Sequence, residues 1–202
     1  MDRNQKKALT DQKIRTAFIM LLNEKGFANL NVSDITITAE ISRGTFYLHY
    51  LDKFDLLEQI EQEILDDVQT LLQNNLDDIA DPKITMPEAH DHLYNLFFKL
   101  ITYGYQHRPL FISLMRPDVD VTFSDRLYQL VVTIFRGKNV LQTQASYSTE
   151  VPEDYAEVIV ILGAFNIFKH WLLKENPETP TEVAEIILTS RFLSPYNLIH
   201  IN

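Results

Sequence analysis

The chain has 202 residues and no cysteine. Disulfide bonds, a thiolate nucleophile and a cysteine-ligated zinc ion are therefore excluded. An absence of cysteine fits a reducing compartment, so we expect a cytoplasmic protein. Hydrophobic residues make up 46% of the chain, which is enough for it to fold without cross-links.

Glycine is also scarce, with five residues in the whole chain. No glycine-rich phosphate loop is present, nor a Ser/His/Asp spacing typical of nucleophilic catalysis. These absences argue against an enzyme, and the sequence indicates no cofactor.

Long apolar runs are missing as well. A membrane-spanning helix needs ~18 consecutive apolar residues. The charged start "MDRNQKKALT" lacks the apolar core of an export signal. We therefore expect a soluble protein that is neither exported nor bound to a membrane.

Negative charge exceeds positive charge, and the net charge is −10. Because nucleic-acid affinity comes largely from neutralised phosphates, this balance by itself argues against a polyanionic partner. The charges are unevenly spread, however. Residues 1–55 contain eight Lys/Arg and seven Asp/Glu, a net charge of +1, and the remainder carries −11. A nearly neutral N-terminal part (residues 1–55, the head) joined to an acidic remainder (the body) is typical of a modular binding protein.

Four helix start signals occur in the first third of the chain. Thr10 can cap a helix that carries an apolar stripe, and Asn31 and Ser42 can cap two short helices. Asp52 can start a long helix that continues to about Leu76. At 1.5 Å per residue, about 25 residues span close to 40 Å, which is long enough to connect two modules.

The rest of the chain also has helical spacing and shows no period-two strand pattern. Prolines interrupt residues 77–87, and residues 107–120 are irregular. The sequence therefore predicts an all-α protein of about nine helices, in which a domain of residues 1–57 is joined by the long helix to a domain of residues 58–202. The later helical stripes lie near residues 93–101, 125–137, 152–174 and 179–192, with a polar loop before the third.

Residues 31–53 carry side chains suited to binding a nucleic acid. Two short capped helices joined by a tight turn form a helix-turn-helix, whose second helix enters the major groove of DNA. Phe46 and Tyr50 occupy inward positions on this second helix. Its outer face presents Arg43 for a guanine edge and Thr45 for a thymine methyl group.

Further side chains near this helix have polar tips that could reach phosphate oxygens, as could the amide groups after Asn31. Packing alone would explain any single one of these residues, whereas the combination favours DNA binding. The candidate DNA-binding residues are Asn31, Ser33, Ser42, Arg43, Gly44, Thr45, Tyr47, Leu48, His49 and Lys53.

The segment of residues 10–57 resembles the N-terminal DNA-binding domain of the TetR (tetracycline repressor) family of bacterial transcriptional regulators, especially in the run "ISRGTFYLHYLDKFDLL" (residues 41–57). The resemblance rests on a hydrophobic-Ser-x-x-Thr-Phe-Tyr-x-His-aromatic pattern, followed by Lys53 and a Leu-Leu pair. Gly26 and residues 31–35 lie where the family ends its first helix and begins its second. The motif covers about a quarter of the chain, and it implies a divergent helical domain for ligand binding and dimerisation after it.

Four residues depart from the family pattern, namely Thr36, Ile37, Glu40 and Leu51. Glu40 stands in the turn where the family usually has a small residue, often glycine, and a non-glycine residue in a left-handed conformation costs about 1 kcal/mol. Leu51 stands where many members have Lys or Arg, which removes one phosphate contact. We therefore expect modest DNA affinity, with specificity that depends on Arg43.

Residues 158–168 are apolar nearly all round, which is more than one buried stripe requires. Gly163 and Ala164 within this segment permit close helix packing. The resemblance implies that the last two helices pair with those of a second copy in a four-helix bundle, whereas a central core helix of a monomer is the alternative. The candidate dimer residues are Val158, Leu162, Phe165, Ile187 and Phe192.

Aromatic and methionine residues in the body suit an amphipathic small molecule, whose identity does not follow from the sequence. Most of them are expected to be ordinary core residues. The acidic balance would favour a cationic ligand, but a solvated face gives the same composition. The candidate ligand-binding residues are Phe97, Ile101, Tyr105, Phe111, Met115, Tyr128, Phe135, Phe165 and Phe168.

The segment "EAHDH" (residues 88–92) resembles a metal motif at first sight. His90 and His92 point apart on a helix, whereas Glu88 and His92 at i, i+4 could share an ion. The start of a surface helix explains the same residues, and we predict no metal site.

Together these features favour a ligand-responsive, sequence-specific transcriptional regulator of the repressor type, which binds a palindromic double-stranded DNA operator as a homodimer. An unknown small-molecule effector would tilt the long helix, change the separation of the two heads and lower operator affinity. The alternative is a helical protein-interaction adaptor that retains the fold without specific DNA binding. The salt dependence of binding would separate the two.

Overall fold

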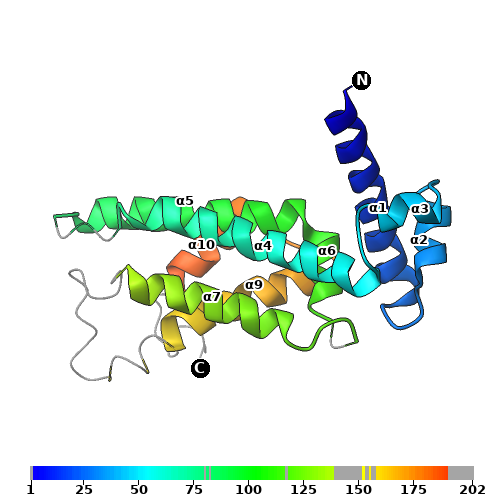
Figure 1. Cartoon of the computed structure of the whole chain (residues 1–202). Helices are drawn as coiled ribbons and strands as arrows, with labels where there is room; N and C mark the ends of the chain where they lie inside the picture. The colour runs from blue at the N-terminus through cyan, green and yellow to red at the C-terminus, as the bar shows by residue number, and fades with distance from the viewer. Residues whose placement is uncertain are drawn as a thin grey trace, which may run out of the picture. The chain divides into compact units, whose positions relative to one another are not determined.

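The computed structural model of the chain describes residues 2–79, 81, 83–116, 118–138, 152, 155 and 158–190. Every regular element in these ranges is a helix and none is a strand, which confirms the all-α prediction (Figure 1). Over the same ranges, no helix is both long and apolar enough to span a bilayer.

The described residues belong to two compact units. One unit contains Met1–Leu65 and Pro109–Ser124, and the other contains Asp66–Arg108 and Asp125–Asn202. The first unit extends past the expected boundary at residue 57 and takes in a later segment of the chain.

The helices of the first unit include three that precede the long helix and one that follows much later. They are α1 (Arg3–Lys25), α2 (Val32–Thr38), α3 (Arg43–Tyr47), the beginning of α4 (Lys53–Leu76) and most of α6 (Arg108–Leu114). The second unit contains the rest of α4, α5 (Met86–Gln106), most of α7 (Phe123–Gly137), the π-helix η1 (Val158–Leu162), α9 (Gly163–Leu173) and α10 (Pro180–Thr189).

The first helix begins earlier than the sequence predicts. Asp2 caps α1 and forms a reciprocal capping box with Gln5, whereas the Thr10 hydroxyl donates to the Lys6 carbonyl at 2.9 Å from within the helix. The expected start at Thr10 is therefore wrong. Residues 3–9 are mostly polar and solvated, so apolar spacing could not detect these first two turns.

The next three start signals are confirmed. The Asn31 side chain accepts from the backbone N–H groups of Ser33 and Asp34, at 2.9 and 3.1 Å. Ser42 Oγ accepts from the Thr45 N–H at 3.0 Å. Asp52 caps α4, which ends at Leu76 as expected. Each cap satisfies backbone donors that have no partner within the helix.

The turn between α2 and α3 places Glu40 in the left-handed region, with φ of 55°. The Ile41 N–H donates to the Thr36 carbonyl across this turn at 3.0 Å, which closes the end of α2. Glu40 therefore stands at a position where the backbone conformation favours glycine, as the departure from the family pattern predicts.

Replacing Glu40 with glycine is expected to raise the free energy of unfolding by about 0.5–1 kcal/mol, since glycine relieves the left-handed strain at some cost in chain entropy. Glu40→Ala is the matched control, because it removes the carboxylate but retains Cβ. Chemical denaturation of the two variants measures the difference. Equal stabilities would show that the positive φ carries no strain.

The core of the first unit joins its helices through buried apolar side chains. Phe18 of α1 meets Phe27 edge to face at 6.3 Å, and Phe46 lies 5.8 Å from the ring of Tyr50. The fully or almost fully buried residues include Ile14, Phe18, Leu22, Leu30, Ile35, Phe46, Tyr50, Leu56, Ile60 and Ile64.

In the second unit, α10 packs along α5, and α5 approaches α9 closely at Gly104. A Cβ at Gly104 would lie 2.5 Å from Phe168 Cε2, so no larger residue fits without a shift. Trp171 is 2% exposed, and its Nε1 donates to the Glu178 carbonyl at 2.9 Å. The close contact at Gly104 was not predicted from the sequence, and the expected role of Gly163 in close helix packing stays a prediction.

Two later predictions are revised in detail. The segment expected to be irregular contains α6, which tolerates Pro109 because the residue lies in the first helical turn. The helix expected from 152 to 174 is described only from η1 onward, as a π-helix that continues into α9. The Thr179 cap and its capping box with Glu182 are confirmed.

Candidate nucleic-acid interface

The recognition helix α3 has one buried and one exposed side. Phe46 and Tyr50 are 0% and 2% exposed, whereas Tyr47 and Leu48 are 56% and 81% exposed. Its inward positions are therefore as predicted. The exposed side leaves two large side chains available for contact with a partner molecule.

Arg43 is exposed at the start of α3, and its guanidinium group donates to the Ser33 hydroxyl of α2. This hydrogen bond brings two candidate DNA-binding residues together across the helix-turn-helix. The remaining guanidinium donors are sufficient for a bidentate contact with a guanine edge.

The residues beside Arg43 form the first turn of α3. Ser42 Oγ lies 2.8 Å from Thr45 Oγ1, so the capping hydroxyl also restrains the threonine. Gly44 is exposed, and a Cβ there would meet only Ser42 Oγ at 3.7 Å. Among the described residues no contact requires glycine at this position, so Gly44 leaves room for the close approach of another molecule.

Two of the amide groups after Asn31, those of Ser33 and Asp34, are already occupied. Asn31 Oδ1 accepts from the N–H groups of Ser33 and Asp34, and Asp34 accepts from the Asn31 N–H at 3.1 Å. A hydrogen bond from Lys25 and that backbone bond lower the pKa of Asp34. The expectation that these amides hold a phosphate is therefore not supported, and Asn31 and Ser33 stay candidates through their side chains.

His49 does not lie on the outer face, because its side chain is only 8% exposed. Its ring stacks against Tyr50 at 6.2 Å, and Nδ1 lies 3.5 Å from Asp11 Oδ1. The prediction of an outward histidine needs correction. Since α3 ends at Tyr47, helical spacing no longer sets the direction of residue 49.

Lys53 is also turned inward. Its ammonium group donates to the carbonyls of Phe27 and Leu30 at 2.8 and 2.9 Å, and it lies 4.6 Å from the centre of the Phe27 ring. Lys53 thus holds the loop between α1 and α2, where carbonyl groups lack helical partners. We therefore leave it out of the proposed phosphate contacts.

A polar network behind the recognition helix was not predicted from the sequence. The Tyr50 hydroxyl donates to Asp11, and Arg15 Nε donates to Asp11 Oδ2 at 2.7 Å and to the Tyr50 oxygen at 3.1 Å. Arg15 also pairs with Glu63 of α4. Only the i, i+4 spacing of Asp11 and Arg15 is a local signal that sequence reasoning could have used.

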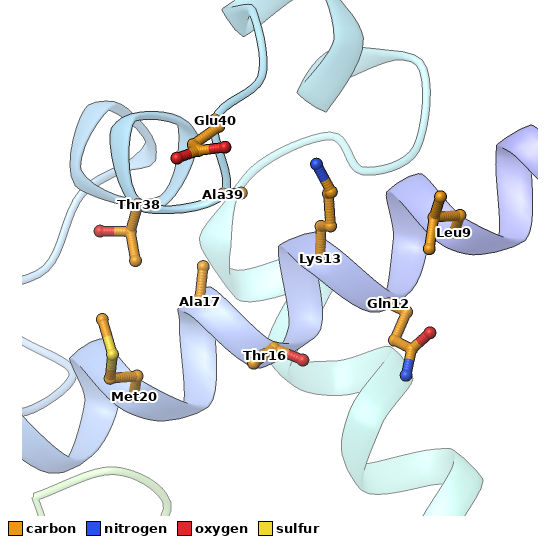
Figure 2. A pocket seen from close by; sticks show the side chains of 9 residues that line it. All are labelled: Leu9, Gln12, Lys13, Thr16, Ala17, Met20, Thr38, Ala39 and Glu40. Atoms are coloured by element: carbon orange, nitrogen blue, oxygen red, sulfur yellow. The ribbon is translucent and has the colours of Figure 1, made fainter.

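A shallow groove runs beside α1 in the first unit (Figure 2). Figure 2 shows Leu9 and Met20 on the α1 side and Glu40 on the opposite, turn side. The lining is completed by Gln12, Lys13, Thr16, Ala17, Thr38 and Ala39.

A second hollow lies in the other unit and is polar. Its lining includes Asp78 and His92, whose Oδ2 and Nδ1 atoms are 4.0 Å apart. Glu88 is committed to the Thr85 capping box, with a hydrogen bond of 2.9 Å from the Thr85 N–H. Among the described residues, no group of three or more acidic or histidine side chains is arranged to bind a metal.

The candidate ligand-binding residues do not line either of these two hollows. Ile101, Phe111 and Phe135 are buried, and Tyr105 is 50% exposed. The Tyr128 and Phe165 rings meet at 5.6 Å. Phe111 and Met115 belong to the first unit, whereas the other seven candidates belong to the second. A common site for all nine stays a prediction.

The candidate dimer residues differ in exposure. Val158 is 46% exposed, and Leu162 and Phe165 are partly exposed. Ile187 is 2% exposed because its face of α10 packs inside the protomer, so this candidate needs correction. Its neighbour Ile186 is 46% exposed. Phe192 lies outside the described residues.

Both parts of the chain match protein-family models. Residues 14–60 match "Bacterial regulatory proteins, tetR family", and residues 91–190 match "Transcriptional regulator C-terminal region". The first match includes the whole helix-turn-helix.

Similar proteins agree with these matches. YttP of Bacillus subtilis (strain 168), named a probable HTH-type transcriptional regulator, is 24% identical over 65% of this chain and 60% of its own length. The HTH-type transcriptional repressor DhaR of Mycobacterium sp. (strain GP1) is 34% identical over 30% of this chain and 31% of its own length. The matches thus span less than two thirds of either relative.

Among solved structures, the fatty acid degradation regulator FadR from Bacillus halodurans superposes with a TM-score of 0.64. It is 15% identical, and the alignment covers 89% of this chain and 92% of that one. This likeness shows the fold. The matching family models, together with a helix-turn-helix that exposes Arg43, Tyr47 and Leu48, support a DNA-binding regulator. The chain belongs to the TetR family of transcriptional regulators.

Proposed function

We propose that the protein is a ligand-responsive repressor that binds a palindromic operator as a homodimer. The observation that carries this proposal is the exposed side of the recognition segment, where Arg43 lies at the start of α3 and Tyr47 and Leu48 lie at its end. Arg43 supplies base specificity, and the hydroxyl groups beside it contact the DNA backbone.

The dimer is supported by apolar side chains that the protomer leaves exposed. Val158 and Ile159 of η1 are 46% and 63% exposed, and Ile186 of α10 is 46% exposed. A two-fold axis through such a surface would present two recognition helices to successive half-sites of a palindrome.

The effector is proposed to bind in the second unit and to act through α4, which continues from that unit into the first. An effector lowers operator affinity only if it binds the two states of the regulator unequally. Since one similar structure is named a fatty acid degradation regulator, fatty acyl compounds are the first class to test.

The test is to incubate the purified protein with sheared genomic DNA of its source organism at about 0.15 M salt, where specific and non-specific binding separate. Sequencing of the retained fragments is expected to show an enriched palindrome. Cross-linking and light scattering measure the dimer, and added acyl-CoA tests release. The absence of any enriched sequence would overturn the proposal.

A protein-interaction adaptor is the second candidate, and exposed apolar residues of the head favour it. Ile37, Leu48 and Leu51 are 76%, 81% and 80% exposed. A partner bound through these residues would respond little to salt, whereas DNA binding weakens steeply as salt rises. A salt titration of the retained complex therefore decides between the two candidates.

A further inference from the structure

Tyr50 places a polar group behind the recognition helix. The residue is 2% exposed, so its ring belongs to the core of the first unit. Its hydroxyl group nevertheless has two partners, Asp11 as acceptor and Arg15 as donor. Burial raises the pKa of Tyr50, and the hydrogen bond to Asp11 raises it further, so the hydroxyl keeps its proton.

Arg15 connects this hydroxyl to the long helix. Its Nε is shared between Asp11 and Tyr50, and its Nη1 pairs with Glu63 of α4. The Arg15 side chain is 26% exposed. Dissolved ions therefore screen its pair with Glu63 less than they would screen a fully exposed pair. Three segments distant in sequence therefore meet at one guanidinium group: α1, the end of the recognition segment, and α4.

The hydrogen bonds of this network depend on direction, whereas the apolar contacts of the surrounding core do not. Apolar contacts depend mainly on buried area and tolerate small rotations. Hydrogen bonds to charged groups are stronger than neutral ones and weaken steeply with angle. A rotation of α4 about its axis would carry Glu63 away from Arg15 before the apolar contacts were lost.

We propose that Arg15 is a positioning residue that couples α4 to the recognition helix through Glu63 on one side and Tyr50 on the other. This inference rests on the proposed function. The network holds α3 at the angle that places Arg43 on its base, and a movement of α4 is transmitted to α3 through Arg15. Asp11, Arg15, Tyr50 and Glu63, which form the network, are not among the candidate DNA-binding residues.

The test uses Tyr50→Phe in the full-length chain, because phenylalanine retains the ring and removes only the hydroxyl. Affinity for the enriched operator is expected to fall about tenfold, while affinity for random DNA stays the same. If Tyr50 had only a structural role, part of the variant protein would be unfolded, and both affinities would fall by the same factor. The ratio of the two affinities is therefore the readout.

Glu63→Gln is the second variant, and Glu58→Gln is its matched control. Both remove one negative charge from an exposed site on α4, but Glu58 has no place in the network. The charge change alone strengthens all DNA binding equally. Only Glu63→Gln is expected to lower the ratio of specific to non-specific affinity.

Combining Tyr50→Phe with Glu63→Gln tests the coupling through Arg15 (the relay) separately from the proposed function. Since both substitutions act through Arg15, their effects should not add. The double variant is expected to lose less operator affinity than the product of the two single fold-losses, and less free energy of unfolding than the sum of the two single losses. Additive unfolding effects would overturn the relay whether or not DNA is bound. Coupled unfolding without any enriched operator would overturn the proposed function and the relay's role in it.

Discussion

Arg43→Ala is expected to lower affinity for the enriched operator about 10- to 100-fold, because a bidentate arginine–guanine contact contributes about 1–3 kcal/mol of discrimination. The residue is exposed at the first position of α3, and within the described part of the chain its side chain donates to the half-buried Ser33. Its removal therefore costs the fold little. The enriched sequence should also become less selective at one base of each half-site.

Two variants serve as controls for Arg43→Ala. Lys7→Ala removes one positive charge from the exposed part of α1 and should weaken binding slightly and equally for all sequences. Arg43→Lys keeps the charge but loses the planar fork, so most of the selectivity should be lost. Repeating the DNA selection with each variant measures both effects. An unchanged enriched sequence for Arg43→Ala would refute this docking.

Phe46→Ala is expected to lower the free energy of unfolding of the first unit by about 3–5 kcal/mol. The ring is 0% exposed and lies between Tyr47 and Tyr50, at centroid distances of 5.6 and 5.8 Å. Truncation would leave a cavity between α3 and its supporting helices. Because the chain has two compact units, amide hydrogen exchange should be followed separately in each.

Tyr47→Ala is the matched control, since it truncates the adjacent aromatic residue, which is 56% exposed. It should lower stability by less than about 1 kcal/mol, mainly through the lost edge-to-face contact with Phe46. It should weaken DNA binding instead. If the two variants destabilised the first unit equally, the assignment of buried and exposed faces of α3 would be wrong.

The sequence predicted which segment carries the candidate site, but it predicted only some of the directions in which the side chains point. The sequence placed Phe46 inward because it lies on the apolar face of α3. Tyr50 is also buried as predicted, although it lies beyond the end of α3. The sequence misplaced His49 because α3 ends two residues earlier. It misplaced Lys53 because the carbonyls that bind the ammonium group belong to residues 23 and 26 positions earlier in the chain.

The second unit shows the same limit. Helical spacing correctly placed apolar stripes on α5, α7 and α10 but did not say which neighbour each stripe would meet. Ile187 is consequently buried against the protomer's own helices, while Ile186 is exposed. The close contact between Gly104 and Phe168 was likewise not predicted, because it joins positions 64 residues apart in the chain.

The sequence by itself determined most of the helices, the caps of α2, α3, α4 and α10, and the family. Capping bonds such as those of Asn31 and Ser42 join groups no more than three residues apart, so local residue order decides them. Only the tertiary structure decided which polar side chains face outward and that Arg15 joins Tyr50 to Glu63. Those partners are 35 and 48 residues from Arg15, and their proximity depends on how whole helices pack.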